Sequence, residues 1–127
     1  MSHWTQIKTT MRDPSSLADA LRELYPGAVV DVARSGITIY GYQGQQRIGV
    51  VAVRGVGAYW TDIGFTLDAD GTLSQIADAG NDWQELHKDA GRRLPQRYAY
   101  HQAIRSARAH GFQLVDEKTA QVARVGG

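Results

Sequence analysis

The most strand-like run of the sequence is Arg47-Ile48-Gly49-Val50-Val51-Ala52-Val53-Arg54. Its six inner residues are apolar at positions of both parities, which is typical of a strand covered on both faces of a sheet. Shorter strand-like segments flank it, separated by turn residues, at 28–33, 37–43, 60–67 and 72–77. We therefore predict a sheet in which residues 47–54 form a central strand.

Helical patterns lie on either side of these strands. A strand-like segment over 3–11 precedes a helix that Asp13 caps, that Pro14 opens and that Pro26-Gly27 ends. A short helix within 81–91 and a longer one from Pro95 to about Gly111 are expected after the strands. A strand over 112–115 follows, with another over 119–125.

The short connections between strands predict hairpins and hence a mostly antiparallel sheet. We expect one α+β domain over residues 1–127, built as two layers with two or three helices on one face of the sheet. On this scheme the segments 28–33 and 37–43 are separate strands joined at Ser35-Gly36.

The composition of the chain excludes several kinds of functional site. The chain has 127 residues, 14 Lys and Arg against 13 Asp and Glu, and no Cys. Without Cys there is no thiolate catalysis, Cys-ligated zinc or disulfide scaffold. No apolar run is long enough to span a membrane, and the cytoplasm is the default location.

The second half of the chain carries a basic ridge. Residues 81–127 hold eight Lys and Arg against five Asp and Glu, whereas residues 1–80 hold six against eight. On an ideal helix Arg97, His101, Arg105 and Arg108 lie within about 80° of one another. A solvated helix face explains this pattern most simply, and an acidic protein partner or a nucleic acid could also dock there.

Two aromatic residues suggest another contact surface. Tyr40 and Tyr42 have the opposite parity to Ile37 and Ile39 in the predicted strand, so we expect them on the sheet face away from the helices. Cross-strand pairing explains them as well as base stacking or a partner interface does.

No catalytic, metal-binding or cofactor-binding motif is found. The four His are not spaced as metal ligands, and Asp68-Ala69-Asp70-Gly71 lacks the positions of a calcium loop. We predict a turn there and name no catalytic residue, metal or cofactor. A small enzyme with an unrecognised site, for example His101 beside a carboxylate such as Asp62, is the remaining catalytic alternative.

Several local strings resemble one family. They are the opening residues 1–9, Gly41-Tyr42-Gln43-Gly44, Asp62-Ile63-Gly64-Phe65, Asp70-Gly71-Thr72 and Gln96-Arg97-Tyr98-Ala99-Tyr100-His101. Together they resemble the hypothetical chloroplast reading frame thirty-five family, a group of small proteins of unknown function.

That resemblance implies a role rather than a reaction. Members of the family are often encoded near an AAA-type ATPase, which implies an adaptor or accessory function. We therefore expect a non-catalytic protein-interaction domain whose partner is another protein, such as an AAA-type ATPase. Nucleic-acid binding through the same basic helix is the alternative, and self-association is also open.

Overall fold

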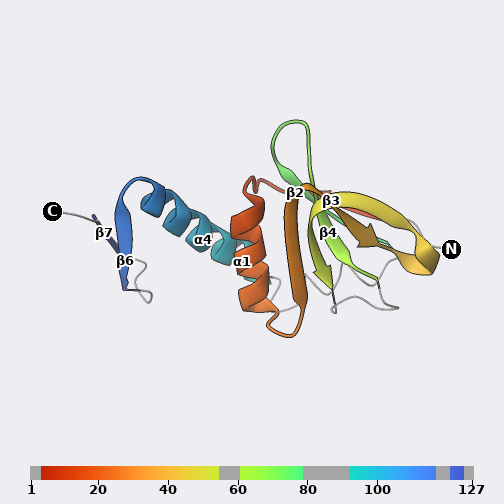
Figure 1. Ribbon diagram of the computed structural model, residues 1–127, viewed down its shortest axis with the longest axis horizontal. Coiled ribbons are helices and arrows are strands. Elements are labelled where there is room, and N and C mark those ends of the chain that lie inside the picture. Colours follow the sequence, from red (N-terminus) through yellow and green to blue (C-terminus); the bar gives the residue numbers. More distant parts are fainter. Residues whose placement is uncertain (1–3, 55–60, 79–91, 117–120, 125–127) are drawn as a thin grey trace.

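The computed structural model describes residues 4–54, 61–78, 92–116 and 121–124 (Figure 1). The fold is α+β, with a five-stranded antiparallel sheet, two helices and a separate two-stranded hairpin in this part of the chain. In chain order the elements are β1 (Trp4–Lys8), α1 (Pro14–Leu24), β2 (Val29–Tyr40), the 3-10 turn η1 (Tyr42–Gly44), β3 (Gln46–Arg54), β4 (Ile63–Leu67), β5 (Leu73–Asp78), α4 (Leu94–Ala109), β6 (Phe112–Asp116) and β7 (Gln121–Arg124). The helix predicted within 81–91 lies outside the described residues.

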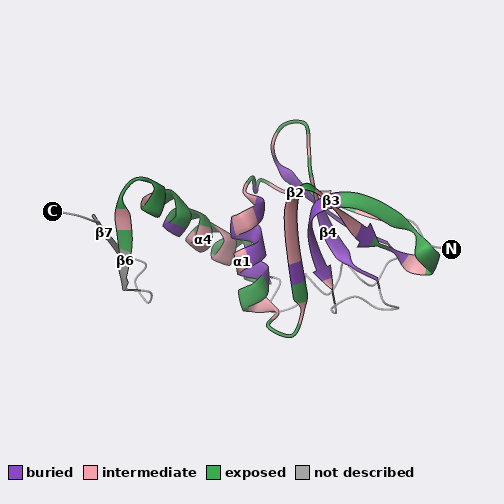
Figure 2. Ribbon diagram, viewed as in Figure 1, coloured by how far each residue is buried: buried purple, intermediate pink, exposed green. Residues whose placement is uncertain are grey.

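Helix α1 begins as its sequence predicts. The Asp13 carboxylate accepts hydrogen bonds from the backbone N–H groups of Ser15 and Ser16, and Pro14 occupies the first turn. Leu17 and Leu21 are fully buried and belong to the apolar cluster that α1 shares with the sheet. Figure 2 shows the buried parts of α1 in purple. Burial of this apolar stripe holds α1 on the sheet.

The sheet has the strand order β1-β5-β4-β3-β2, and every neighbouring pair is antiparallel. Strand β3 is therefore internal, and Val50 to Val53 are all buried, as predicted. The prediction is wrong for Ile48, in the same run, which is 66% exposed. The Asp68–Gly71 turn also forms, with Gly71 at a φ of 86°.

The prediction of two strands over 28–33 and 37–43 is wrong. Residues 29–40 form one long strand, β2, whose register against β3 shifts between Val32 and Ile37. Gly36, at a φ of 117°, lies in this irregularity. Gly36, which predicts a hairpin turn from the sequence, thus lies where a continuous strand bends, as at a β-bulge. Figure 1 shows β2 and β3 curving together.

Two apolar clusters form. The larger one joins α1 to the sheet, whereas Ile39 belongs to a second cluster with Ala52, Ile76 and Trp4. A Cβ on Gly64 would lie 2.1 Å from Ile39 Cδ1, so this close approach requires glycine. Ile39 therefore does not pack in the helix-covered core that the sequence pattern suggested.

Helix α4 extends from α1 and away from the sheet, and the β6–β7 hairpin lies at its far end (Figure 1). Its first turns reach the large core through buried Leu94 and partly buried Tyr98. The apolar spacing of α4 predicts a buried stripe of Tyr100, Ala103, Ile104 and Ala107. Ile104 is buried, Tyr100 and Ala107 are partly exposed, and Ala103 is exposed. The expectation for Ala103 is wrong because α4 rests on α1 rather than on a broad sheet face.

Candidate functional site

The predicted basic ridge of α4 faces an acidic stripe on α1. Arg97 donates to both carboxylate oxygens of Glu23, from Nε at 2.7 Å and from Nη2 at 2.6 Å. His101 Nε2 lies 3.1 Å from Glu23 Oε2, and Arg105 Nη2 donates to Asp19 Oδ2 at 2.6 Å. The hydrogen bond from Arg97 lowers the pKa of Glu23 below its usual value.

This geometry corrects one expectation about the ridge. Arg97 and His101 do not project freely into solvent, since their side chains are only 22% and 24% exposed and contact Glu23. Arg105 is 46% exposed beside Asp19, and Arg108 is exposed. Their role in binding a partner stays a prediction, and in the structure three of the four residues help to fasten α4 to α1.

A residue that the sequence analysis did not single out strengthens this joint. The Tyr98 hydroxyl accepts hydrogen bonds from the backbone N–H groups of Arg12 and Asp13, each at 3.0 Å. The signal for the ion pairs was present, because Asp19 and Glu23 are four residues apart on α1, as Arg97, His101 and Arg105 are on α4. Only the packing of the two helices shows that these spacings match.

The predicted aromatic surface is divided between two environments. Tyr40 is 45% exposed at the end of β2, and the Arg54 guanidinium lies 5.7 Å from its ring centre. Tyr42 lies in η1, and its backbone N–H donates to Asp78 Oδ2 at 2.7 Å. Tyr40 is therefore exposed, but it does not lie on the predicted face, because Ile39, its neighbour of opposite parity, packs in the cluster away from α1. Tyr42 belongs to the turn and not to a strand.

Asp62 lies beside Tyr40 rather than beside His101. Its buried carboxylate accepts hydrogen bonds from the Tyr40 backbone N–H and from Arg54. Burial raises the pKa of Asp62 above its usual value, although these bonds oppose the shift. His101 contacts Glu23 instead, so the structure does not form the His101–Asp62 pair of the enzymatic alternative.

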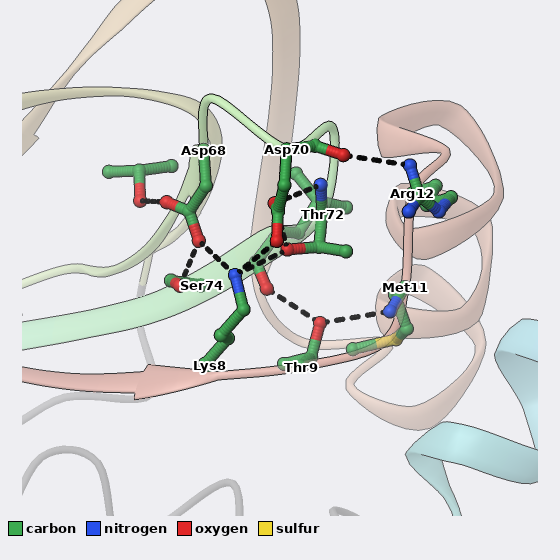
Figure 3. Close-up of polar contacts among 10 residues, drawn as sticks. Lys8, Thr9, Met11, Arg12, Asp68, Asp70, Thr72 and Ser74 are labelled. Carbon is green, nitrogen blue, oxygen red and sulfur yellow. Dashed lines mark hydrogen bonds and ion pairs between the residues drawn. The ribbon is translucent and has the colours of Figure 1, made fainter.

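A polar cluster ties β1 to the turn between β4 and β5 (Figure 3). Lys8 Nζ donates to Asp70 Oδ2 at 2.7 Å and to Thr72 Oγ1 at 2.9 Å. Asp68 accepts from Ser74 Oγ at 2.5 Å and lies 3.5 Å from Lys8 Nζ. The hydrogen bond that Lys8 donates to Asp70 raises the pKa of Lys8, so the amine stays charged and unsuited to act as a base. The cluster therefore has a structural role, because it fastens β1 to the turn between β4 and β5, and we call it the Lys8 clip.

A groove runs beside β1 on the sheet face that carries Ile76. Its lining residues come from β1, β3, β4 and β5 and are Trp4, Thr5, Gln6, Arg47, Ile48, Thr66 and Ile76. Ile48 is 66% exposed, the highest value among the large apolar side chains that the structure describes. The Arg47 guanidinium lies 5.4 Å from the Trp4 ring centre and is the one charged group among the lining residues that the structure describes. An aromatic, an aliphatic and a cationic side chain thus meet at one concave surface.

Among the described residues, no three His, Asp or Glu side chains lie close enough together to hold a metal ion. No helix among the described residues has the length and apolar character needed to cross a membrane.

Comparison with known proteins places the chain in a family. Residues 20–125 match the family described as "Protein of unknown function (DUF1257)", and the chain belongs to this family. The uncharacterized protein ycf35 of Pyropia yezoensis is similar to it, with 30% identity over 132 residues that cover 100% of this chain and 91% of the relative. These findings confirm the resemblance to the chloroplast reading frame thirty-five family. No solved structure matches the chain significantly.

Proposed function

We propose that the chain is a non-catalytic protein-interaction domain that acts as an adaptor. The observation that carries the proposal is the exposed Ile48 beside Trp4 and Arg47 in the groove along β1. A large apolar side chain exposed next to an aromatic ring and a cation is the kind of surface that a protein partner covers.

The hydrogen bonding of three titratable side chains supports the same proposal. Lys8, Glu23 and Asp62 are each held by hydrogen bonds within the chain. Groups engaged in this way are suited to hold elements together, whereas catalysis needs an acid, base or nucleophile presented to a substrate.

The layered architecture bears on where a partner would dock. We take the domain as two layers, with α1 on one face of the sheet, since α1 contacts β2 and β3 and shares an apolar cluster with the sheet. The groove and the β1 edge are then left for a partner. Tyr40 and Arg108 are exposed elsewhere on the surface and could extend the contact.

The resemblance supplies the partner class. Because family members are often encoded near an AAA-type ATPase, we propose that this ATPase, or a protein on which it acts, is the partner, with the cytoplasm as the place of encounter. Nucleic-acid binding is the competing function, and its contacts would be the exposed arginines of α4.

A pull-down with the full chain tests the proposal. Lysate is treated with nuclease, and proteins retained by wild type, by Arg47→Glu and by Arg97→Ala/Arg105→Ala are compared by mass spectrometry. Adaptor function predicts a discrete protein retained by wild type and lost with Arg47→Glu. Retention of only nuclease-sensitive material would contradict the proposal and favour nucleic-acid binding.

A further inference from the structure

Strand β1 is an edge strand. In the sheet order it stands at one end and pairs with β5 alone among the described residues. The Thr9 backbone N–H donates to the Leu73 carbonyl at 3.0 Å, and Lys8 lies opposite Ser74. Because hydrogen-bonded positions alternate in an antiparallel pair, Thr5 and Ile7 also point their backbone groups toward β5. The backbone groups of Gln6 and Lys8 therefore point outward.

The groove lies against this outward edge. Gln6 is opposite Ile76 in the β1–β5 register, and both side chains line the groove with Trp4. A strand added to β1 would place its residues opposite Trp4 and Gln6 on this same face, because alternate side chains share a face. The groove that these side chains would enter is also lined by Ile48, Ile76 and Arg47, and the Arg47 guanidinium lies against the Trp4 ring.

The charge of the groove indicates which side chains the added strand would carry. Arg47 forms no ion pair within the part of the chain that the structure describes, in contrast to Arg54, Arg97 and Arg105. A carboxylate in the incoming segment would supply the missing partner with a charge-assisted hydrogen bond. Thr66, Ile76 and Ile48 leave the neighbouring part of the groove uncharged, which suits an aliphatic side chain.

We propose that the β1 edge binds an extended segment of a partner protein as an added antiparallel strand, with an aliphatic residue opposite Gln6 and an acidic residue opposite Trp4. Main-chain hydrogen bonds to Gln6 and Lys8 supply the attachment, and the groove supplies the selectivity, as in other cases of strand addition. The antiparallel direction follows the rest of the sheet and is the more stable pairing. This inference rests on the proposed protein-interaction function and specifies the partner segment.

The first test is a titration of the nitrogen-15-labelled full chain with a capped peptide, Ser-Thr-Val-Thr-Glu-Thr-Ser, followed by NMR. We expect saturable shifts confined to β1 and the groove, and hydrogen exchange at the Gln6 and Lys8 amides slowed several-fold. A peptide with Lys in place of Glu should bind wild type at least about threefold more weakly. Arg47→Glu should reverse this preference. Absence of saturable shifts at β1, or no reversal, would overturn the inference.

A matched pair of variants tests the backbone contacts. Gln6→Pro removes an outward N–H without touching the β1–β5 ladder, and proline is accepted at such edge positions. Gln6→Ala keeps the N–H and removes the side chain. Peptide binding should survive Gln6→Ala and fall at least about fivefold in Gln6→Pro, with the NMR spectrum confirming that both fold. Equal binding by the two variants would overturn the strand-addition geometry.

Two further outcomes separate this inference from the proposed function. If Gln6→Pro and Gln6→Ala retain the same partner protein equally from lysate, the edge inference fails while the adaptor function stands. If wild type retains no protein at all, the adaptor function fails. Sedimentation showing that β1 pairs with a second copy of the chain, lost in Gln6→Pro, would also overturn a separate partner as the occupant.

Discussion

Arg97 on α4 and Glu23 on α1 form a two-pronged ion pair, with Nε 2.7 Å from Oε2 and Nη2 2.6 Å from Oε1. The same carboxylate lies 3.1 Å from His101 Nε2. Residues predicted to form an exposed contact ridge therefore join two helices, through pairs that are 74 and 78 positions apart in the sequence.

Removing this acceptor should loosen α4. For Glu23→Gln we expect the free energy of unfolding to fall by about 0.5–1 kcal/mol, since the pair is partly exposed but has paired hydrogen bonds. Urea unfolding followed by circular dichroism measures the change. Arg108→Gln, at an exposed position of the same helix, is the control and should change stability little. Equal effects of the two variants would show that the ion pair does not fasten the helices.

Lowering the pH should remove the stabilisation that the contact between Lys8 and Asp70 provides. The hydrogen bond from Lys8 holds the pKa of Asp70 well below its usual range. Because this folded-state pKa lies below the unfolded value of about 3.9, ionised Asp70 stabilises the fold above that value. The contribution is lost as the pH falls through the folded-state pKa.

The corresponding variant is Asp70→Asn. Its free energy of unfolding should fall less steeply than that of wild type below about pH 4, measured by urea unfolding between about pH 7 and pH 2. Asp31→Asn, a carboxylate paired with Arg54 elsewhere, serves as a control for loss of an acidic residue. Parallel curves for wild type and Asp70→Asn would contradict the clip.

The close contact at Gly64 predicts a strong packing effect. A methyl group there would lie 2.1 Å from Ile39 Cδ1 and 2.6 Å from Ile39 Cγ1, so Gly64→Ala should lower the free energy of unfolding by about 1–3 kcal/mol. Gly27→Ala, whose added methyl meets nothing within 4 Å, is the matched control.

A double variant separates this packing clash from other effects at Gly64. Ile39→Ala removes the atoms that the new methyl meets, so Ile39→Ala/Gly64→Ala should be less destabilised than the sum of the single changes. Additive effects would show that the two residues are not coupled. All four variants can be compared by thermal unfolding under one set of conditions.

Much of the fold could be predicted from local sequence signals. Three features depend on neighbouring residues alone: the Asp13-Pro14 start of α1, the internal strand at residues 47–54 and the turn at Asp68–Gly71. The continuity of β2 through Gly36 could not be predicted, because a turn and a bulge both favour glycine. Only the pairing of β2 with β3 decides between them.

The candidate site was harder to predict for the same reason. Arg97, His101 and Arg105 show a clear spacing, but whether they face water or Glu23 and Asp19 depends on how α4 lies against α1. The groove was missed altogether, since Trp4, Arg47 and Ile76 come from three strands and share no motif. Tyr40 is exposed, but the face predicted for it from strand parity is wrong, because Ile39, of opposite parity, packs in the cluster away from α1.

The most direct test of the adaptor function places a photo-crosslinking amino acid at Gln6 in the full chain within cells. An equivalent substitution at Ala99, exposed on α4, is the control. We expect a discrete protein adduct from position 6 that disappears with Arg47→Glu and is weak or absent from position 99. Adducts with nucleic acid alone, or no adduct from position 6, would contradict a protein-interaction function at the β1 edge.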